Sequence, residues 1–358
     1  SLEAYEAARE IYATDKSPYA SSAMFWTAVD MMRMWVNEGR MEEAARIFTA
    51  LERLTSEKSV ACVATVGMFD GVHRGHQFVI GKVVEKARET GLSSTVITFD
   101  KVPRQVLDSS FHPQLLTTLE EKEAILRQLG VDTLAILPFT RETAGLSARA
   151  FIQQVLREQL QTEILITGYD NRFGHDRTEG FDDYVRYGRT LGIQVLRGDA
   201  QLMDDGQRPV SSSVIRQLLA EEGRVDLMPH YLTRFYQLRG TVAAGEHIGH
   251  KLGYPTANME PEDTDKLIPA PGVYAVWTTL EGEQQQRAAM MNIGNRPTFH
   301  GSRQTLEVNI FDFDGDLYGQ TISVSFVKRL RAERRFESPE ALAIQLKADK
   351  EQVKDILR

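Results

Sequence analysis

The sequence predicts two folded domains of different class: an α/β domain on a parallel sheet, then an antiparallel β-barrel that ends in a helix. The length of 358 residues exceeds what one ordinary core accommodates. From residue 60 onward, strand-like and helical patterns alternate, which indicates strand–helix–strand units and hence a parallel sheet. After about Pro229 the alternation stops, and strand patterns follow one another until a single C-terminal helix.

The composition is typical of a soluble globular protein, with 42% hydrophobic and 26% charged residues. A formal net charge of −8 without any basic run argues against nucleic acid as a partner. The single cysteine, Cys62, lies in an apolar run and excludes a disulfide framework. No apolar run reaches the length of a membrane span, and no signal-peptide pattern opens the chain. We therefore expect a cytoplasmic protein that binds no membrane.

Residues 1–57 predict an additional helical segment at the N-terminus. Apolar residues recur at helical spacing over 24–37 and 42–54, and residues 38–40 form a turn between them. Nothing in this segment has the pattern of a catalytic site. We interpret it as a packing element or as a surface for a protein partner.

The α/β domain is predicted over residues 58–228. Its expected strands are 60–66, 94–99, 133–137, 163–167 and 193–197, and its expected helices are 77–90, 119–129, 148–159 and 181–190. Thr118, with Glu121 three residues later, has the spacing of a capping box, and Gly130 ends that helix. The carboxyl ends of parallel strands gather ligand-binding loops, here 67–76, 168–176 and 208–216.

The barrel is predicted over residues 229–358. Its expected strands are 236–242, 272–278, 288–293, 305–311 and 321–326, followed by a helix over 339–357. Turn signals such as Asp314-Gly315 separate these strands without intervening helical patterns, which favours an antiparallel arrangement.

The stretch 65–77, TVGMFDGVHRGHQ, is the expected centre of the α/β domain. A strand leads through a turn into a helix start, where free N–H groups and the helix dipole favour phosphate. Three glycines let the backbone approach a ligand closely, namely Gly67, Gly71 and Gly75. His73 and His76 can donate hydrogen bonds to phosphates and to the charge that develops during transfer. The spacing matches neither a Walker A loop nor the dinucleotide Gly-x-Gly-x-x-Gly fingerprint.

This stretch resembles the His-x-Gly-His signature of the nucleotidyltransferase superfamily. The longer string GMFDGVHRGHQ resembles the bacterial bifunctional riboflavin kinase/FMN adenylyltransferases. Further landmarks of that family follow in order: TF at 98–99, LPFT at 137–140, GYDNRFG at 168–174 and SSSVIR at 211–216. The resemblance covers about residues 60–358 and implies a Rossmann-like nucleotidyltransferase domain followed by a riboflavin kinase barrel.

In the first domain the resemblance implies a site for ATP and FMN. The family's two histidines contact ATP phosphates and its Ser-Ser-x-x-Ile-Arg motif helps to close the site, which corresponds to His73, His76, Ser212 and Arg216. Residues 211–213 also suit a helix N-cap, with Arg216 in the first turn as a forked phosphate clamp. Further ligand contacts are expected at Gly67, Phe69, Asp70, Gly71, Gly75 and Asp170. The two aspartates could orient flavin or ribose, or could stabilise their turns instead.

The second expected site combines the string GHKLGYPTAN at 249–258 with the strand at 305–313. In an extended segment Thr256 and Asn258 face the same way, and their oxygens can help to hold Mg²⁺. Glu307 lies in mid-strand among apolar neighbours, which points to a salt bridge or a general base.

Pro-Thr-Ala-Asn resembles the riboflavin kinase signature, and the family's glutamate takes the proton from the riboflavin 5′-hydroxyl. The resemblance therefore implies that Glu307 is the base and that Thr256 and Asn258 lie at the metal. The strings NIGNRPTF and RAERRFES match further family landmarks. Additional ligand contacts are expected at Gly249, Lys251, Gly253, Asn292 and Arg331.

Four positions depart from the family pattern. Val102 precedes Pro103 where a histidine is common, and Asn171 replaces a common aromatic residue. His250 replaces an arginine and Asn309 replaces a common histidine. These departures affect contact details and leave the proposed catalytic groups in place.

The resemblance implies an enzyme that phosphorylates riboflavin to FMN and then adenylylates FMN to FAD, with ATP as co-substrate and Mg²⁺ as cofactor. One alternative is a chain in which a single module is active. A second is a flavin-binding regulatory protein that uses the same folds, with the N-terminal helices recruiting a partner. A mid-strand base such as Glu307 argues against a regulatory protein, because a sensor needs no base.

Overall fold

The computed structural model of the chain describes residues 61–108, 111–169, 171–175, 178–198, 210–243, 256–298 and 301–358. The predicted N-terminal helical segment, 1–57, lies outside these residues. The described chain forms two compact units. The first unit holds described residues from 61–69, 75–111 and 119–198, and the second holds 70–74, 112–118 and described residues from 210 onward. The predicted domain boundaries near 58 and 229 stay a prediction.

The first unit is built on the predicted parallel sheet. Its strands are β1 (Cys62–Val66), β2 (Ser93–Phe99), β3 (Thr133–Leu137), β4 (Thr162–Thr167) and β5 (Gln194–Arg197), in the order β3-β2-β1-β4-β5. Every pairing between neighbours is parallel. Because β2 and β4 lie on opposite sides of β1, the strand order reverses at β1, and ligands bind at such switch points.

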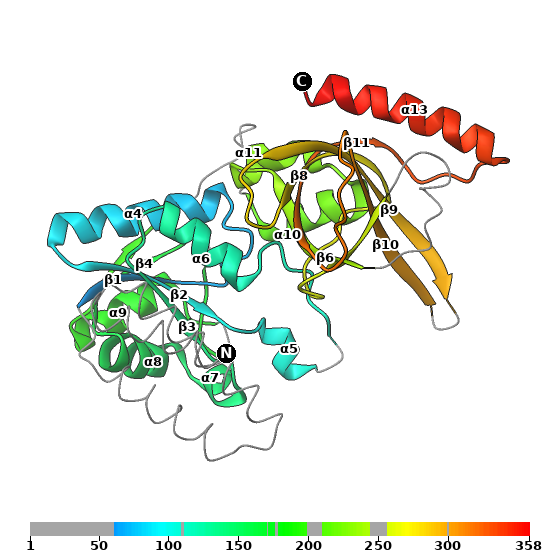
Figure 1. Cartoon of the computed structure of the whole chain (residues 1–358). Helices are drawn as coiled ribbons and strands as arrows, with labels where there is room; N and C mark the ends of the chain where they lie inside the picture. Colours follow the sequence, from blue (N-terminus) through cyan, green and yellow to red (C-terminus); the bar gives the residue numbers. More distant parts are fainter. Residues whose placement is uncertain are drawn as a thin grey trace, which may run out of the picture. The chain divides into compact units, whose positions relative to one another are not determined.

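Helices cover both faces of this sheet (Figure 1). Val63 and two residues of β4 pack against α4 (Arg74–Thr90) on one face. Cys62, Ala64 and Val66 pack against the other layer, because side chains alternate along a strand. That layer consists of α8 (Ala148–Phe151), the π-helical η1 (Ile152–Gln159) and α9 (Phe181–Leu191).

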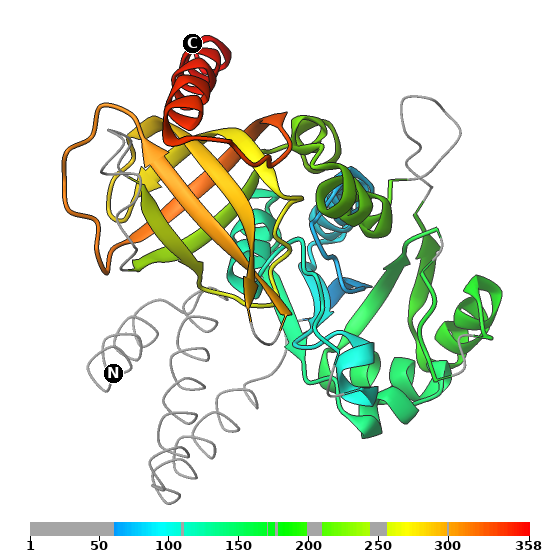
Figure 2. The ribbon, with the colours of Figure 1, turned by 90° about the vertical axis from the view of Figure 1, so that its right-hand side faces the viewer.

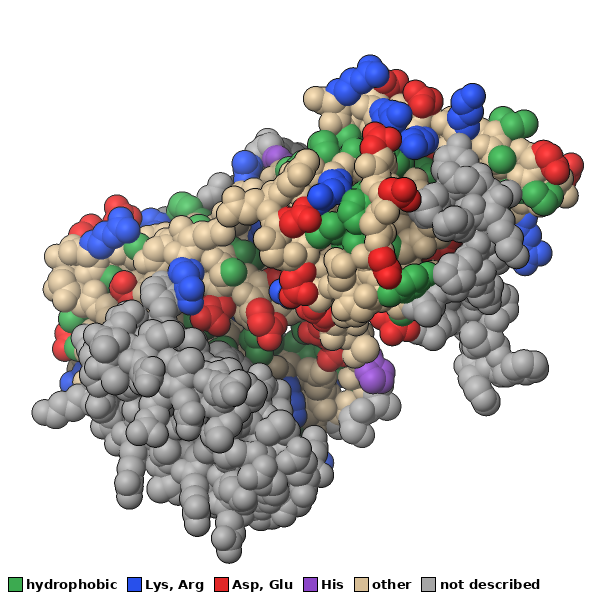
Figure 3. Space-filling model, viewed as in Figure 1, with side chains coloured by type: hydrophobic (Ala, Val, Ile, Leu, Met, Phe, Trp, Pro, Cys, Tyr) green, Lys and Arg blue, Asp and Glu red, His purple; other side chains and the backbone are tan. Residues whose placement is uncertain are grey.

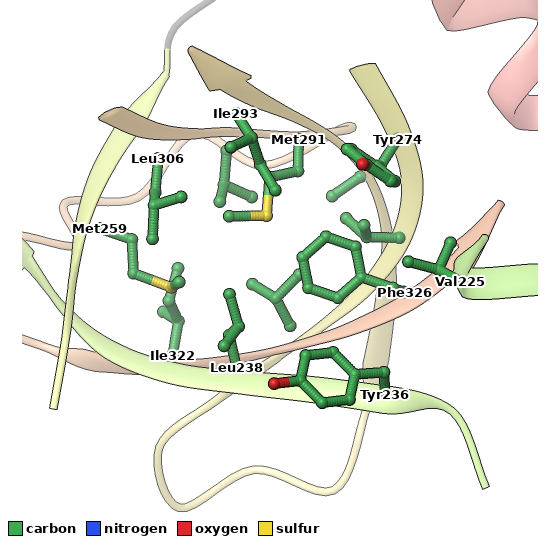
Figure 4. Packing of buried hydrophobic residues seen from close by; sticks show 14 of the residues in the cluster. Val225, Tyr236, Leu238, Met259, Tyr274, Met291, Ile293, Leu306, Ile322 and Phe326 are labelled. Atoms are coloured by element: carbon green, nitrogen blue, oxygen red, sulfur yellow. The ribbon is translucent and has the colours of Figure 1, made fainter. Parts of the chain in front are cut away.

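The second unit contains a closed antiparallel barrel (Figure 2). Its strands are β6 (Tyr236–Ala243), β7 (Ala257–Pro261), β8 (Gly272–Leu280), β9 (Gln286–Thr298), β10 (Gly301–Ile310) and β11 (Thr321–Arg331). They close in the order β10-β7-β6-β11-β8-β9, which leaves no free sheet edge. Alternate residues point inward, and Figure 4 shows Leu238, Tyr274, Leu306 and Phe326 converging on one core.

Helix α13 (Pro339–Ile356) packs on the outside of the barrel. Val353 and Leu357 contact Val273, Ala275 and Met290, the outward-facing residues of β8 and β9. This cover explains why β8 is buried on both faces. Figure 3 shows acidic and basic side chains interspersed along the exposed side of α13.

The predicted fold class is therefore confirmed, and every predicted strand and helix from residue 60 onward is present within a few residues of its expected ends. The structure adds elements that lack a long apolar period: α5 (Pro103–Leu107), α7 (Arg141–Gly145), α10 (Ser212–Gln217), η2 (Leu218–Glu222), η3 (Val225–Leu227), α11 (Met228–Leu232) and β7. Helix α6 spans Leu119–Gln128 and is followed by Gly130 at φ +80°, as its stop signal predicts. Among the described helices, none is long and apolar enough to cross a membrane.

One ion pair fastens α13 to the barrel. Asp349 is fully buried, and its carboxylate accepts from Arg331 at Nε (3.0 Å) and Nη2 (2.8 Å). Removing one partner of a buried pair leaves a desolvated charge. An Asp349→Asn variant is therefore expected to lower the free energy of unfolding by about 3–5 kcal/mol, measured by urea denaturation. Asp355→Asn on the same helix, where the pair with Arg358 is exposed, should change it by less than about 1 kcal/mol.

Candidate active sites

The signature loop, residues 67–76, begins where β1 ends at the switch point of the sheet. Gly67 N donates to Ile97 O at 3.0 Å, which ties the start of the loop to β2. Arg74 opens α4, so Gly75 and His76 lie in the first turn of that helix. The His76 and Phe69 rings form a T-shaped pair, with the ring centroids 5.2 Å apart. The predicted helix start is thus present, and it begins three residues earlier than expected.

The loop backbone is strained. Phe69, Gly71 and Val72 have φ values of +47°, +81° and +39°. A β-branched residue such as Val72 rarely adopts positive φ. Both Phe69 and Val72 are buried, so packing holds them in these conformations. Glycine suits position 71, because L side chains rarely adopt a φ of +81° and an added Cβ would lie 2.9 Å from Leu116 Cδ1.

Asp70 is the centre of a hydrogen-bonded cluster in the second unit. Its carboxylate, 4% exposed, accepts from Leu116 N at 2.9 Å and from Thr117 N at 3.1 Å. Arg216 Nη2 lies 2.7 Å from Asp70 Oδ2. These contacts are those of a turn-stabilising aspartate, and ligand contact by Asp70 stays a prediction.

Ser212 and Arg216 both reach the signature loop. Ser212 Oγ donates to Asp70 O at 2.9 Å, and Arg216 Nε donates to Gln114 O at 2.9 Å. Ser211 caps α10 as predicted, since its Oγ accepts from Val214 N. Arg216, however, lies in the last turn of this six-residue helix, not in the first. The structure therefore brings Asp70, Gly71, Ser212 and Arg216 together.

His73 lies inside the protein, 4% exposed. Burial lowers the pKa of His73 to about 4, because the charged imidazolium is poorly solvated there. At neutral pH the imidazole is therefore uncharged, and it can act as a neutral hydrogen-bond donor.

This burial predicts a pH dependence of stability. Between pH 6.5, where the unfolded histidine titrates, and about 4, the unfolded chain binds more protons at His73 than the folded chain. Stability from this residue is therefore lost as the pH falls through that window. Relative to His73→Gln, the free energy of unfolding of the wild type is expected to fall by about 2.5 kcal/mol between pH 7 and 4.5, measured by urea denaturation. A difference in free energy of unfolding between the two proteins that does not change with pH would contradict a lowered pKa of His73.

Lys122 is a candidate site residue that sequence reasoning missed. It lies on α6, is 4% exposed, and its Nζ donates to Met68 O at 2.7 Å and to Thr98 Oγ1 at 3.1 Å. Thr98 Oγ1 also donates to Met68 O at 3.1 Å. A buried ammonium group thus holds the strained start of the signature loop. The sequence signal was a lysine at a position of α6 that faces the sheet.

Three predicted kinase residues form a row across neighbouring strands of the barrel. Glu307 on β10 lies directly opposite Asn258 on β7 and opposite Asn292 on β9. Directly paired residues of an antiparallel sheet have side chains on the same face, with Cβ atoms about 5 Å apart. Leu306 and Val308 are buried in the barrel core, so this row lies on the outer face.

Thr256, which directly precedes β7, lines a cavity of about 400 Å³ in the second unit. The wall also includes Ala257, Val308, Phe313 and Tyr318, and it includes neither Asn258 nor Glu307. Hydroxyl, amide and carboxylate oxygens from Thr256, Asn258 and Glu307 suit a hard cation such as Mg²⁺. Among the described residues, no group of three or more His, Cys, Asp or Glu side chains could hold a metal ion.

Arg331 continues the same row on β11. Val273 pairs with both Asn292 and Arg331, so Arg331 lies three strands from Glu307, which is the opposite side of the closed six-stranded barrel. Its guanidinium is bound to Asp349, which gives it an anchoring role, and ligand contact by Arg331 stays a prediction.

Glu333 is a second residue that sequence reasoning missed. A Cβ added to Gly294 would lie 3.0 Å from Glu333 Oε1 and 3.5 Å from Asn292 Nδ2, so both side chains approach the same point. A further carboxylate therefore lies close to the predicted kinase row. The predicted ligand residues Asp170, Gly249, Lys251 and Gly253 lie outside the described residues.

Three of the four positions that depart from the family pattern lie in the described part of the chain, namely Val102, Asn171 and Asn309. The Asn171 amide donates to Val66 O at the end of β1, so it ties its loop to the sheet. Pro103 opens α5, a position that suits its missing N–H. Asn309 is buried on β10 opposite Met290. His250 lies outside the described part of the chain.

Comparison with known proteins identifies the same two regions. Residues 55–214 match the family described as FAD synthetase, and residues 232–357 match the family described as riboflavin kinase. The chain is 34% identical to the bifunctional riboflavin kinase/FMN adenylyltransferase of Escherichia coli K12, over 85% of this chain and 95% of that protein. The protein of the same name from Pseudomonas fluorescens is 38% identical, over 80% of this chain and 90% of that protein.

The chain is also similar to a solved structure described as a macrolide-efflux protein from Streptococcus pneumoniae, with a TM-score of 0.76 and 32% identity. The match covers 83% of this chain and 95% of that one. The ordered motifs, the two folds and these matches agree over nearly the same residues. The chain therefore belongs to the bifunctional riboflavin kinase/FMN adenylyltransferase family of transferases.

Proposed function

We propose that the two reactions of this family take place at the two sites described above, riboflavin kinase on the barrel and FMN adenylyltransferase at the signature loop. The chain is an enzyme that phosphorylates riboflavin to FMN with ATP and then adenylylates FMN with ATP to give FAD and pyrophosphate. The observation that carries the assignment of the kinase site is the row of Asn258, Glu307 and Asn292 on three neighbouring strands.

In the kinase reaction Glu307 is the general base. The 5′-hydroxyl oxygen of riboflavin forms a bond to the γ-phosphorus of ATP, the bond from that phosphorus to the β,γ-bridging oxygen breaks, and ADP leaves. The hydroxyl proton passes to the Glu307 carboxylate. Glu307 is half-buried in the middle of β10. The cavity beside Thr256 offers space for one of the substrates.

In the second reaction a phosphate oxygen of FMN forms a bond to the α-phosphorus of ATP, and the bond to the α,β-bridging oxygen breaks. Pyrophosphate leaves, and no covalent enzyme intermediate is needed. His76 in the first turn of α4 and the neutral His73 donate hydrogen bonds to the phosphates. Arg216, 31% exposed in its side chain, adds positive charge while it remains paired with Asp70.

Mg²⁺ belongs to the kinase site in this proposal, held by Thr256 and Asn258 beside Glu307. When bound, it would neutralise charge on the ATP phosphates. A cytoplasmic location fits the single buried cysteine, Cys62, and residues 1–57 are assigned to contact with a protein partner. The domains proposed are 1–57, 58–228 and 229–358.

One experiment tests both activities. The purified protein is incubated with riboflavin, ATP and Mg²⁺, and the flavins are separated by chromatography. Both FMN and FAD are expected to accumulate, and FMN supplied alone with ATP should give FAD. Formation of FMN without FAD would show a single active module. Binding of flavin without any product would favour the regulatory alternative.

A further inference from the structure

The second half of the signature loop is held by side chains that come much later in the chain. Ser212 Oγ donates to Asp70 O at 2.9 Å, and Arg234 Nη2 donates to the next carbonyl, Gly71 O, at 2.7 Å. Arg234 also donates through Nη1 to Leu232 O at 2.9 Å, which orients its planar guanidinium. Arg234 follows the end of the FAD synthetase match at residue 214 and lies inside the riboflavin kinase match.

A second support reaches the same loop through Leu116. Leu116 N donates to the Asp70 carboxylate, and Leu116 O accepts from Lys266 Nζ at 2.9 Å. Lys266 is 7% exposed and lies between β7 and β8 of the barrel. Leu115 forms a parallel β-bridge with Lys266, in which Leu115 N donates to Asp265 O and Leu267 N donates to Leu115 O. Lys266 therefore holds the segment that in turn holds Asp70.

These supports act on a backbone that would not keep its conformation unaided. Val72 has a φ of +39°, which a β-branched residue rarely adopts, and such strain persists only where the surroundings over-determine it. His73 follows directly. A shift of about 1 Å in a catalytic group costs about 100-fold in rate, so loss of these donors affects catalysis through position.

We propose that Arg234 and Lys266 are positioning residues for adenylyl transfer, although both lie in the region that matches riboflavin kinase. The inference rests on the proposed function of the signature loop. FAD formation thus depends on side chains of the kinase half, whereas neither residue belongs to the row of Asn258, Glu307 and Asn292.

The test measures both activities of the same molecule in Arg234→Met and Lys266→Met. Methionine keeps the apolar stem and removes the hydrogen-bond donors. We expect kcat for FMN adenylylation to fall at least 10-fold, with KM for ATP changed less than threefold and kcat of riboflavin kinase changed less than twofold. Arg234→Lys keeps one donor and should recover part of the loss. The control Arg239→Met, on the exposed side of β6, should change neither activity by more than twofold.

A merely structural role would remove active protein and lower both activities by the same factor, and that outcome would overturn the inference. Adenylylation at the wild-type rate in Arg234→Met would overturn it as well. If Lys266→Met does not fold, the rates of Arg234→Met and Arg234→Lys still test the inference. A wild-type protein that forms no FAD from FMN would instead refute the proposed function, so the two failures are distinguishable.

Discussion

A Glu307→Gln variant is expected to lose riboflavin phosphorylation by about 10²–10⁴-fold and to keep FMN adenylylation within twofold. Glutamine has nearly the shape of glutamate but cannot accept the proton of the riboflavin hydroxyl, and a general base contributes about that factor. The measurement is the rate of FMN formation from riboflavin and ATP, beside the rate of FAD formation from FMN and ATP, with the same protein preparation.

Glu281→Gln provides the matched control for this experiment. Glu281 follows β8 of the same barrel, where its carboxylate is exposed and lies 3.5 Å from Arg239. Its substitution should leave both rates unchanged. A Glu307→Gln protein that phosphorylates riboflavin normally would show that the base lies elsewhere, with Glu333 as the next carboxylate to test.

The converse result is expected for His76→Ala. Adenylylation of FMN should fall by about 10²–10³-fold, the usual effect of removing one preorganised donor to a developing negative charge. Riboflavin phosphorylation should stay within twofold, because His76 lies on α4 of the first unit and the kinase row lies on the barrel. The measurement is again the rate of FMN formation from riboflavin beside the rate of FAD formation from FMN.

His112→Ala is the control for His76→Ala, because the side chain of His112 is 85% exposed. It should leave both rates unchanged. Equal loss of both activities in a folded His76→Ala protein would contradict the assignment of two separate sites.

Much of the fold followed from local sequence patterns. Strand and helix periods are properties of short segments, so the expected strand 133–137 coincides with β3, and Glu307 lies in mid-strand between the buried residues Leu306 and Val308. Helix α6 ends before Gly130 for the same reason, since glycine readily adopts the left-handed conformation. Short elements such as α10 were incompletely predicted, because a helix of six residues has too few turns to show an apolar period.

The site residues divide in the same way. The sequence by itself determined which chemical groups are present: two histidines at a helix start, a serine and an arginine near a second helix, and a carboxylate in mid-strand. The tertiary structure alone decided what these groups face. It places Glu307 between Asn258 and Asn292. It also places the Asp70 carboxylate against Leu116 N and Arg216, and it brings Lys122 Nζ within hydrogen-bond distance of Met68 O. The physical reason is that period and turn chemistry act within a few residues. Strand register and buried hydrogen bonds instead join segments as much as 163 residues apart, as in the contact of Arg234 with Gly71.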